Sequence, residues 1–355
     1  MQIPKPKNKN QKILIAMSGG VDSSVAVALL QKVGWKPVGV TMQLDADHTA
    51  QNIKDAQKVA QQLSIQHFIL DLSDTFRKEV IDYFVNEYTQ GRTPNPCVIC
   101  NQKLKFGRLL EEAQEMGIDY IATGHYAQIS KNAERRYQLK KAKDLSKDQS
   151  YFLYRLSQDQ LKNAIFPLGN LEKTNVRKIA SELGLTVAEK KESQEICFIK
   201  DNDYKSFIEK ESRIKNQLGD FLDINGNKIG EHEGIFKYTI GQRKGLKISA
   251  PKPYFVTSIN IKDNTITLGQ DTDTYSSKCF ALDVNWVSIE KQLKPFEAQA
   301  RVRYTATEQS AIITPTDQDK LQIEFKKPQR AITPGQSIVL YNQNTVLAGG
   351  IISML

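Results

Sequence analysis

The sequence has few cysteines and no long apolar run, and each shortage excludes a class of protein. Nowhere do apolar residues approach the ~18 in succession that a membrane-spanning helix needs, so we expect no membrane contact. The first residues read MQIPKPKNKNQK, which are basic and lack the apolar core of a secretory signal, so we expect a cytoplasmic protein. Four cysteines in such a chain argue against a structural disulfide framework and favour thiol chemistry or metal binding.

Internal repeats and low-complexity tracts are also absent from the sequence. At 355 residues the chain exceeds the length of one typical hydrophobic core, so two or three domains are expected. Hydrophobic residues make up 40% and charged residues 25%, as in an ordinary soluble globular protein. The net charge of +9 favours a polyanionic partner, of which nucleic acid is the commonest.

One stretch near the N-terminus has the composition of an anion-binding turn. Residues Lys12–Ser24 read KILIAMSGGVDSS, which is an apolar strand, a turn at Gly19 and Gly20, and the start of a helix. The glycines let main-chain N–H groups approach a ligand closely, and the helix start adds unpaired N–H donors and the positive end of its dipole. Three serines add hydroxyl donors, so a phosphate or pyrophosphate is the expected ligand.

This turn differs from the P-loop of kinases and GTPases. That loop needs a lysine in the pattern G-x-x-x-x-G-K-[ST], and no lysine stands between residues 13 and 24. The arrangement S-G-G-x-D-S-S instead resembles the PP-loop of the ATP pyrophosphatase superfamily, which binds the departing pyrophosphate while a substrate oxygen takes the AMP. The plain alternative is an ordinary strand–turn–helix joint with a serine cap.

Apolar strands alternate with amphipathic helices through the first part of the chain, which predicts βαβ units and a parallel sheet. The expected strands are residues 13–17, 37–42, 67–70 and 119–123, and the expected helices are residues 53–63, 75–88, 104–116 and 171–183. For the last helix, Thr174 is the candidate N-cap and Gly184 the stop. Ligands of such sheets bind at the carboxyl ends of the strands, where the glycine turn lies.

Beyond about Ser206 the segments shorten, alternate between apolar and polar residues, and are separated by Gly and Asn turns. In residues 296–304 the alternation puts Arg301 and Arg303 on the polar face of a strand and Tyr304 on its core face. Short antiparallel strands with polar outer faces predict small β-barrels or sandwiches. The expected fold class is α/β, with a parallel-sheet PP-loop domain at residues 1–205, a small β-rich central domain at 206–280 and a C-terminal β-barrel at 281–355.

Two cysteines lie in the segment GRTPNPCVICN, residues 91–101. Its two prolines predict a rigid extended loop that leads into a helix. Cys97 and Cys100 are three residues apart and can therefore share one side of the first helical turn. The helix N-terminus and the basic neighbours Lys103 and Lys105 predict lowered thiol pKa values and hence more thiolate.

The other two cysteines leave several interpretations open. The interpretation we favour pairs Cys100 with Cys197, about a hundred residues on, across one active site beside the nucleotide. A structural zinc site needs four ligands, which would have to be Cys97, Cys100 and Cys197 with Cys279 or a histidine. A thioredoxin-like pair lacks its usual fold context, and Cys279 has the surroundings of an inert thiol.

Six motifs occur together, in one order, along nearly the whole chain. They are SGGVDSS at residues 18–24, GRTPNPxxxCN at 91–101, TGHYA at 123–127, KDQSYFL at 147–153, SQEICFI at 193–199 and YTIGQRKGL at 238–246. This combination resembles the bacterial tRNA-specific 2-thiouridylases (the MnmA/TrmU family) of the PP-loop superfamily.

The resemblance implies an enzyme that carries out ATP-dependent 2-thiolation of the wobble uridine of tRNA. The C2 oxygen would be adenylated, and sulfur from a cysteine persulfide would then replace it, with release of AMP and pyrophosphate. Cys197 would carry the persulfide and Cys100 would attack it, leaving a Cys100–Cys197 disulfide that an external reductant must open. The implied nucleotide-binding residues are Ala16, Met17, Ser18, Gly19, Gly20, Val21, Asp22, Ser23, Met42 and Gly124.

The resemblance also implies two macromolecular partners, the anticodon stem-loop of tRNA and a protein that donates persulfide sulfur. Mg²⁺ is expected wherever ATP is split to pyrophosphate, with Asp22 as a candidate ligand. The implied tRNA-contacting residues are Asn95, Pro96, Cys97, His125, Lys147, Asp148, Gln149, Arg303, Tyr304 and Gln336.

The sequence departs from a common family pattern at Cys97, where an aspartate proposed to assist at the base often stands. Cys97, Cys100 and Cys197 together would suit an iron–sulfur cluster with one open iron, so cluster-dependent thiolation is a second hypothesis. A small-molecule PP-loop ligase would explain the glycine turn but not the cysteines. An RNA-binding protein held together by zinc would explain the charge and the thiols but not the turn.

Overall fold

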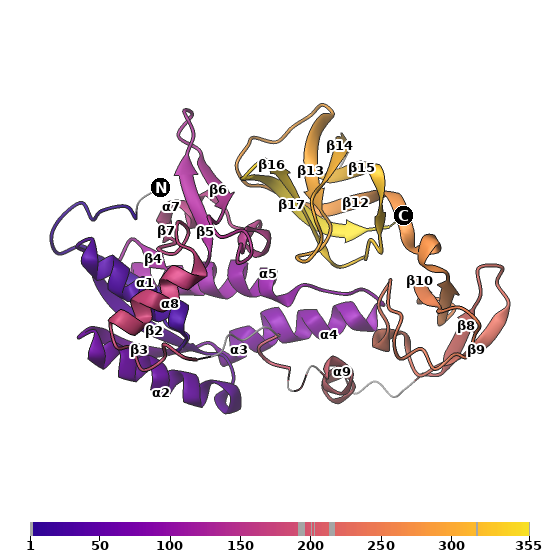
Figure 1. The fold of residues 1–355 in the computed structure, drawn as a ribbon, viewed down its shortest axis with the longest axis horizontal. Helices are drawn as coiled ribbons and strands as arrows, with labels where there is room; N and C mark the ends of the chain where they lie inside the picture. The colour runs from indigo at the N-terminus through magenta and orange to yellow at the C-terminus, as the bar shows by residue number, and fades with distance from the viewer. Residues whose placement is uncertain are drawn as a thin grey trace.

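The structure is a computed structural model that describes residues 3–190, 196–199, 201, 203–212, 217–316 and 319–354. It contains an N-terminal α/β unit, a small middle sheet and a C-terminal barrel, as Figure 1 shows. This arrangement confirms the predicted fold class. None of the helices within those ranges combines the length and the apolar character that a membrane span requires.

The N-terminal unit is built on a five-stranded sheet in the order β3-β2-β1-β4-β7, in which every pairing is parallel, as predicted. Its strands are β1 (Lys12–Ala16), β2 (Lys36–Gln43), β3 (Gln66–Asp71), β4 (Ile121–Ala122) and β7 (Ala164–Ile165). Its helices are α1 (Val21–Lys32), α2 (Ala46–Gln62), α3 (Ser73–Phe76), α4 (Asp82–Thr89), α5 (Pro96–Cys100), α6 (Leu109–Glu115), α7 (Gln158–Asn163) and α8 (Lys173–Glu182). β1 and β2 are apolar because both of their faces are covered.

Two of the predicted helices are longer than expected and contain π-helical turns. Residues Arg77–Ile81 join α3 to α4, and residues Asn101–Arg108 join α5 to α6. The second of these helices begins at Pro96, where the proline loop is predicted to lead into a helix, and continues without a break into the helix predicted at residues 104–116. A proline fits the first helical position because its missing N–H has no partner to lose there.

The predicted N-cap of α8 is wrong by two residues. Glu172 occupies the N-cap position, and Thr174 lies inside the first turn. The backbone N–H of Lys173 is satisfied instead by Asp144 Oδ2 at 3.0 Å, a partner from a distant loop. The predicted stop is confirmed, since Gly184 has φ +61°, the left-handed conformation that ends helices.

The rest of the chain forms two β-rich units. The middle sheet has the order β10-β11-β8-β9, and the barrel has the order β12-β15-β14-β13-β16-β17, closed by pairing of β12 with β17. The hairpin β5 (Ala127–Lys131) and β6 (Tyr137–Lys141) of the N-terminal unit extends the barrel sheet through β17. The elements are β8 (Gly219–Leu222), β9 (Lys228–His232), β10 (Phe255–Asn260), β11 (Thr265–Gly269), β12 (Tyr275–Trp286), β13 (Phe296–Arg301), β14 (Gln309–Thr316), β15 (Lys320–Arg330), β16 (Ser337–Asn342) and β17 (Thr345–Ser353), with α9 (Tyr204–Ser212) before them.

One buried apolar cluster spans the N-terminal unit and the barrel. It contains Leu14 from β1 and Val339 from β16, with Tyr151 and Tyr154 of the KDQSYFL motif in the same cluster. Both tyrosines are fully buried, and the Tyr151 hydroxyl donates to Ser337 O at 2.8 Å. The barrel is therefore packed onto the parallel-sheet unit through a shared core.

The contact between Gly349 of β17 and Tyr154 gives a test of this shared core. A Cβ at Gly349 would lie 2.4 Å from Tyr154 Cδ2, and the buried ring has no space into which it can move. We expect Gly349→Ala to lower the free energy of unfolding by about 1–3 kcal/mol, as overpacking does. Ser353→Ala on the same strand is the matched control, and urea denaturation of both variants is the measurement. Equal midpoints would contradict a rigid contact here.

Candidate functional site

The strand order of the parallel sheet predicts a crevice between the carboxyl ends of β1 and β4. Strands β2 and β3 follow on one side of β1, whereas β4 lies on the other side, so the strand order reverses there. Ligands of open α/β sheets bind at such a reversal. The glycine turn follows β1 and the TGHYA motif follows β4, so the two motifs share this crevice.

The glycine turn folds back onto the first turn of α1. The Ser18 N–H donates to Ser23 Oγ at 3.2 Å, and Ser24 Oγ donates to Gly20 O at 2.7 Å. Gly20 is the N-cap of α1, and in the described residues no side chain caps this helix. The first N–H groups of α1 therefore remain available for an anion.

Glycine is required at two positions of this crevice. Gly19 has φ +66°, and a Cβ there would lie 2.3 Å from Asn52 O. Gly124, in TGHYA, needs no special backbone angle, but a Cβ would lie 2.8 Å from Ser23 N and 3.0 Å from Asp22 C. The loop after β4 thus packs directly on the start of α1, which brings together two sets of residues that the resemblance assigned to the nucleotide.

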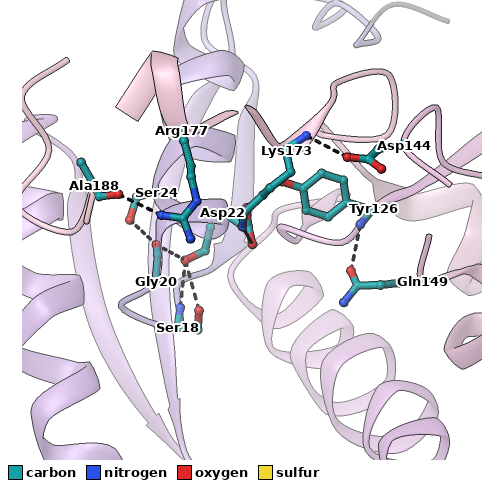
Figure 2. Close-up of polar contacts among 11 residues, drawn as sticks. Ser18, Gly20, Asp22, Ser24, Tyr126, Asp144, Gln149, Lys173, Arg177 and Ala188 are labelled. Atoms are coloured by element: carbon teal, nitrogen blue, oxygen red, sulfur yellow. Dashed lines mark hydrogen bonds and ion pairs between the residues drawn. The ribbon is translucent and has the colours of Figure 1, made fainter. Parts of the chain in front are cut away.

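A buried lysine from α8 pairs with the aspartate of the glycine turn. Lys173 Nζ lies 2.7 and 2.8 Å from the two carboxylate oxygens of Asp22, and the Tyr126 hydroxyl donates to Asp22 Oδ1 at 2.8 Å. Figure 2 shows Lys173 and Arg177 extending from α8 toward the turn. Lys173 is only 7% exposed, so its charge requires this partner. The loop itself has no lysine, and the fold supplies one from about 150 residues further along the chain.

A second lysine holds the glycine turn from the other side. Lys190 Nζ donates to Gly19 O at 3.0 Å, to Asn52 Oδ1 at 3.0 Å and to Asp55 Oδ2 at 2.6 Å. This ammonium lowers the pKa of the Asp55 carboxyl below its usual value. Sequence analysis assigned no role to Lys173 or Lys190, because nothing local distinguishes them from surface lysines.

The proline-rich segment before the cysteines is held by the barrel and by the middle unit. Gln336 Nε2 donates to Thr93 O at 2.9 Å and to Pro94 O at 3.2 Å, and the Thr93 N–H donates to Pro334 O at 2.9 Å. The Thr93 hydroxyl lies 3.0 Å from the Thr239 hydroxyl of the YTIGQRKGL motif. All three units therefore contact the loop that leads into Cys97.

Cys100 and the residues on either side of Cys197 belong to one apolar cluster. Cys100 lies in an apolar cluster with Ile196 and Phe198, the residues on either side of Cys197, and Met42 at the end of β2 belongs to the same cluster. Residues 193–195 of SQEICFI lie outside the described residues. All four cysteines are free thiols, with Cys97 and Cys197 exposed and Cys100 buried. Cys279 lies in the barrel core, apart from the other three.

The predicted lowering of the thiol pKa values is wrong. Burial raises the pKa of Cys100 to about 12, and desolvation also raises the pKa values of Cys97 and Cys197, while the charge of Lys105 opposes the rise at all three. The open faces of Cys97 and Cys197 let water offset part of this desolvation. Cys100 is therefore the thiol whose ionisation depends most on a nearby cation.

Several residues that the resemblance assigned to tRNA make internal contacts. Asp148 is 3% exposed and accepts from Ala142 N and Ser150 N, and Gln149 Oε1 accepts from Tyr126 N at 2.9 Å. His125 Nδ1 lies 2.7 Å from Thr123 Oγ1, and burial holds its pKa well below the usual value. The KDQSYFL motif thus contacts the TGHYA motif directly, through the hydrogen bond from Tyr126 N to Gln149 Oε1.

The two barrel arginines also bond within the protein. Arg303 Nη2 donates to Ile240 O at 3.1 Å and to Ala331 O at 2.9 Å, so it links the barrel to the YTIGQRKGL loop. Arg301 does not project from an outer face as predicted, because its Nε donates to Ala306 O and its guanidinium lies over the Tyr304 ring. Tyr304 is half-buried and packs against Phe152, with ring centroids 4.5 Å apart.

Among the described residues no set of three or more His, Cys, Asp or Glu side chains is placed to bind a metal ion. Asp22, the candidate for Mg²⁺, already accepts three hydrogen bonds from Lys173 and Tyr126. Because Mg²⁺ in nucleotide sites takes most of its ligands from phosphates and water, Asp22 fits as one ligand at most.

Three known families match consecutive parts of the chain. The tRNA methyl transferase HUP domain matches residues 11–201, the tRNA methyl transferase PRC-barrel domain residues 205–270 and the aminomethyltransferase beta-barrel domain residues 276–352. These matches correspond in order to the parallel-sheet unit, the middle sheet and the C-terminal barrel.

Two solved structures resemble the chain over somewhat more than half of its length. A 4-thiouridine synthetase in complex with RNA and ATP has a TM-score of 0.39 and 17% identity, covering 57% of this chain and 50% of its own. NMN synthetase from Francisella tularensis has a TM-score of 0.34 and 18% identity, covering 59% of this chain and 79% of its own. Similarities at this level carry no functional argument.

Relatives in sequence cover almost the whole chain. The tRNA-specific 2-thiouridylase MnmA 2 of Thermoanaerobacter sp. (strain X514) is 49% identical, covering 97% of this chain and 98% of the relative. The tRNA-specific 2-thiouridylases MnmA of Acetivibrio thermocellus and Clostridioides difficile are both 46% identical, covering 96% and 97% of this chain. With a HUP-domain match over more than half of its length as well, the chain belongs to the tRNA-specific 2-thiouridylase (MnmA) family.

Proposed function

We propose that this chain catalyses the ATP-dependent replacement of the C2 oxygen of the wobble uridine of tRNA by sulfur. The observation that carries the proposal is that, in a chain of this family, the glycine turn, Met42 and the neighbourhood of Cys100 and Cys197 lie at one edge of the parallel sheet. A small-molecule ligase needs the turn alone, whereas this arrangement joins a nucleotide site to thiols.

In the first step the uridine C2 oxygen attacks the α-phosphate of ATP, and pyrophosphate leaves. Residues 16–23 would bind the phosphates through the free N–H groups of the α1 start. Met42 and Gly124 would border the nucleotide, since they lie at the ends of β2 and β4. Lys173 neutralises Asp22, so the turn presents no uncompensated negative charge to the incoming phosphates. Mg²⁺, when bound with ATP, would neutralise charge on the phosphates.

In the second step sulfur moves from Cys197 to the activated base. A donor protein would leave a persulfide on Cys197, and the Cys100 thiolate would attack the sulfur bonded to Cys197. This forms a Cys100–Cys197 disulfide and releases HS⁻, which displaces AMP at C2. In the alternative order the outer sulfur bonds to C2 first, and Cys100 then breaks the sulfur–sulfur bond. Both orders leave the same disulfide, and a dithiol reductant would restore the two thiols.

The tRNA would approach from the side of the loop that leads into α5. Asn95, Pro96 and Cys97 would contact the target base, because they lie at the start of the helix that carries Cys100. Further contacts are proposed for His125, Lys147, Asp148, Gln149, Arg303, Tyr304 and Gln336. For Asp148, Gln149 and Gln336 the hydrogen bonds described above favour a role in shaping this surface.

Cysteine variants test the sulfur-transfer step. We expect Cys100→Ser and Cys197→Ser each to abolish 2-thiouridine formation and to change tRNA affinity by less than about twofold, since the thiols act after binding. The measurements are mass spectrometry of tRNA nucleosides and a tRNA binding assay. Cys279→Ala is the matched control and should keep thiolation, because Cys279 lies in the barrel core. Thiolation by either Ser variant would refute the assigned roles.

Iron and sulfide analysis after anaerobic purification separates this relay from a cluster on Cys97, Cys100 and Cys197.

The contact of Gly124 with the start of α1 tests the nucleotide site. We expect Gly124→Ala to weaken ATP binding by about tenfold or more, because its methyl group must displace the Ser23 N–H or the TGHYA loop. Calorimetric titration with ATP is the measurement. Gly117→Ala is the control for backbone strain alone, since Gly117 has φ +70° but a Cβ there meets nothing within 4 Å. An unchanged dissociation constant in Gly124→Ala would place the nucleotide elsewhere.

A further inference from the structure

Lys105 follows Cys100 on the same helical run, and among the described residues it has no ion pair with a carboxylate. We propose that Lys105 is a charge-stabilising residue of the sulfur chemistry, whose ammonium holds negative charge on the sulfur of Cys100 and on sulfur carried by Cys197. The inference rests on the roles proposed above for these two cysteines. It assigns a task to a side chain that binds neither the nucleotide nor the base in the proposed mechanism.

The helix that carries Cys100 also positions Lys105. Residues Asn101–Arg108 form π-helical turns directly after Cys100. In such turns residues five apart are neighbours along the axis, because each N–H bonds to the carbonyl five residues earlier. Lys105 follows Cys100 by five residues, so it lies one turn further along the same face. π-helical turns within α-helices are frequent at functional sites.

No carboxylate of the described residues forms an ion pair with Lys105. Lys105 is half-buried, and within the described part of the chain it has neither an ion pair nor a hydrogen bond. Three other cations of the described site are paired, since Lys173 contacts Asp22, Lys190 contacts Asp55 and Arg92 contacts Glu87. A partly desolvated ammonium without a carboxylate favours an anion that forms during the reaction.

The charged groups around Cys100 identify that anion as sulfur. Among the described residues, Lys105 is the one cation that acts on the pKa of the Cys100 thiol, and it opposes the rise caused by burial. The thiols of Cys97 and Cys197 act in the other direction and raise this pKa. The Lys105 charge also acts on the pKa values of Cys97 and Cys197. With burial it also keeps the pKa of His125 well below its usual value, so His125 is neutral near pH 7 and adds no second positive charge.

Alkylation of the full-length reduced protein tests the proposal without substrate. Rates of iodoacetamide reaction at Cys100 and Cys197 are measured over a range of pH by peptide mass spectrometry. For Lys105→Met we expect the pH profile of Cys100 to move upward by about one unit, which makes alkylation near neutral pH about tenfold slower. Lys105→Arg should restore most of the rate because it restores the charge.

Lys103→Met is the matched control, because Lys103 is an exposed lysine two residues away on the same helical segment. It should leave the profile of Cys100 unchanged. A Lys105→Met profile identical to that of the unsubstituted protein, or an equal shift in Lys103→Met, would overturn the proposal. If Lys105→Met does not fold, Lys105→Gln takes its place and must show the same shift.

A second measurement separates sulfur from phosphate as the anion. tRNA-dependent pyrophosphate release precedes sulfur transfer, so Lys105→Met should keep that rate while losing thiolation. Loss of pyrophosphate release would mean that Lys105 binds ATP or an RNA phosphate, and would also overturn the proposal. Thiolation by Cys100→Ser would instead refute the proposed function, while the alkylation profile of Cys197 would still report on Lys105.

Discussion

The site depends on hydrogen bonds that other units make to the backbone of the proline-rich segment, residues 91–96. Residues 91–96 contain two prolines, which lack N–H donors and keep the chain extended. Gln336 and Pro334 of the barrel form hydrogen bonds with the backbone groups of Thr93 and Pro94. The Thr93 hydroxyl pairs with the Thr239 hydroxyl of the middle unit. Because α5 begins at the end of this segment, all three units together determine where Cys97 and Cys100 lie.

A comparable arrangement holds the glycine turn. Its N–H groups and the α1 dipole attract anions, yet Asp22 places a negative charge on the same turn. Lys173 and Tyr126 resolve this conflict by bonding both carboxylate oxygens, and they come from α8 and from the loop after β4. The Tyr126 N–H in turn bonds Gln149, so the KDQSYFL motif supports the nucleotide crevice from behind.

At the thiols, burial outweighs the helix start. A helix N-terminus offers roughly half a unit of positive charge, whereas full burial shifts a pKa by up to about 3–5 units. Cys100 is buried among apolar side chains that include Phe198 and Leu104, so its thiol stays protonated unless a full charge lies close by. Lys105 carries such a charge five residues further along the same helical run, and no local pattern distinguishes it from Lys103.

The sequence by itself determined the local features of this protein. The alternation of β1, α1 and β2, the glycine turn, the Pro96 helix start and the six motifs all depend on neighbours along the chain, and residue order specifies these directly. Only the tertiary structure decided which distant groups meet. The partners in three such contacts, Lys173 with Asp22, Gln336 with Thr93 and Arg303 with Ile240, are 63 to 243 residues apart in the chain. No local pattern encodes such contacts, because burial and charge at each position are set by packing between units.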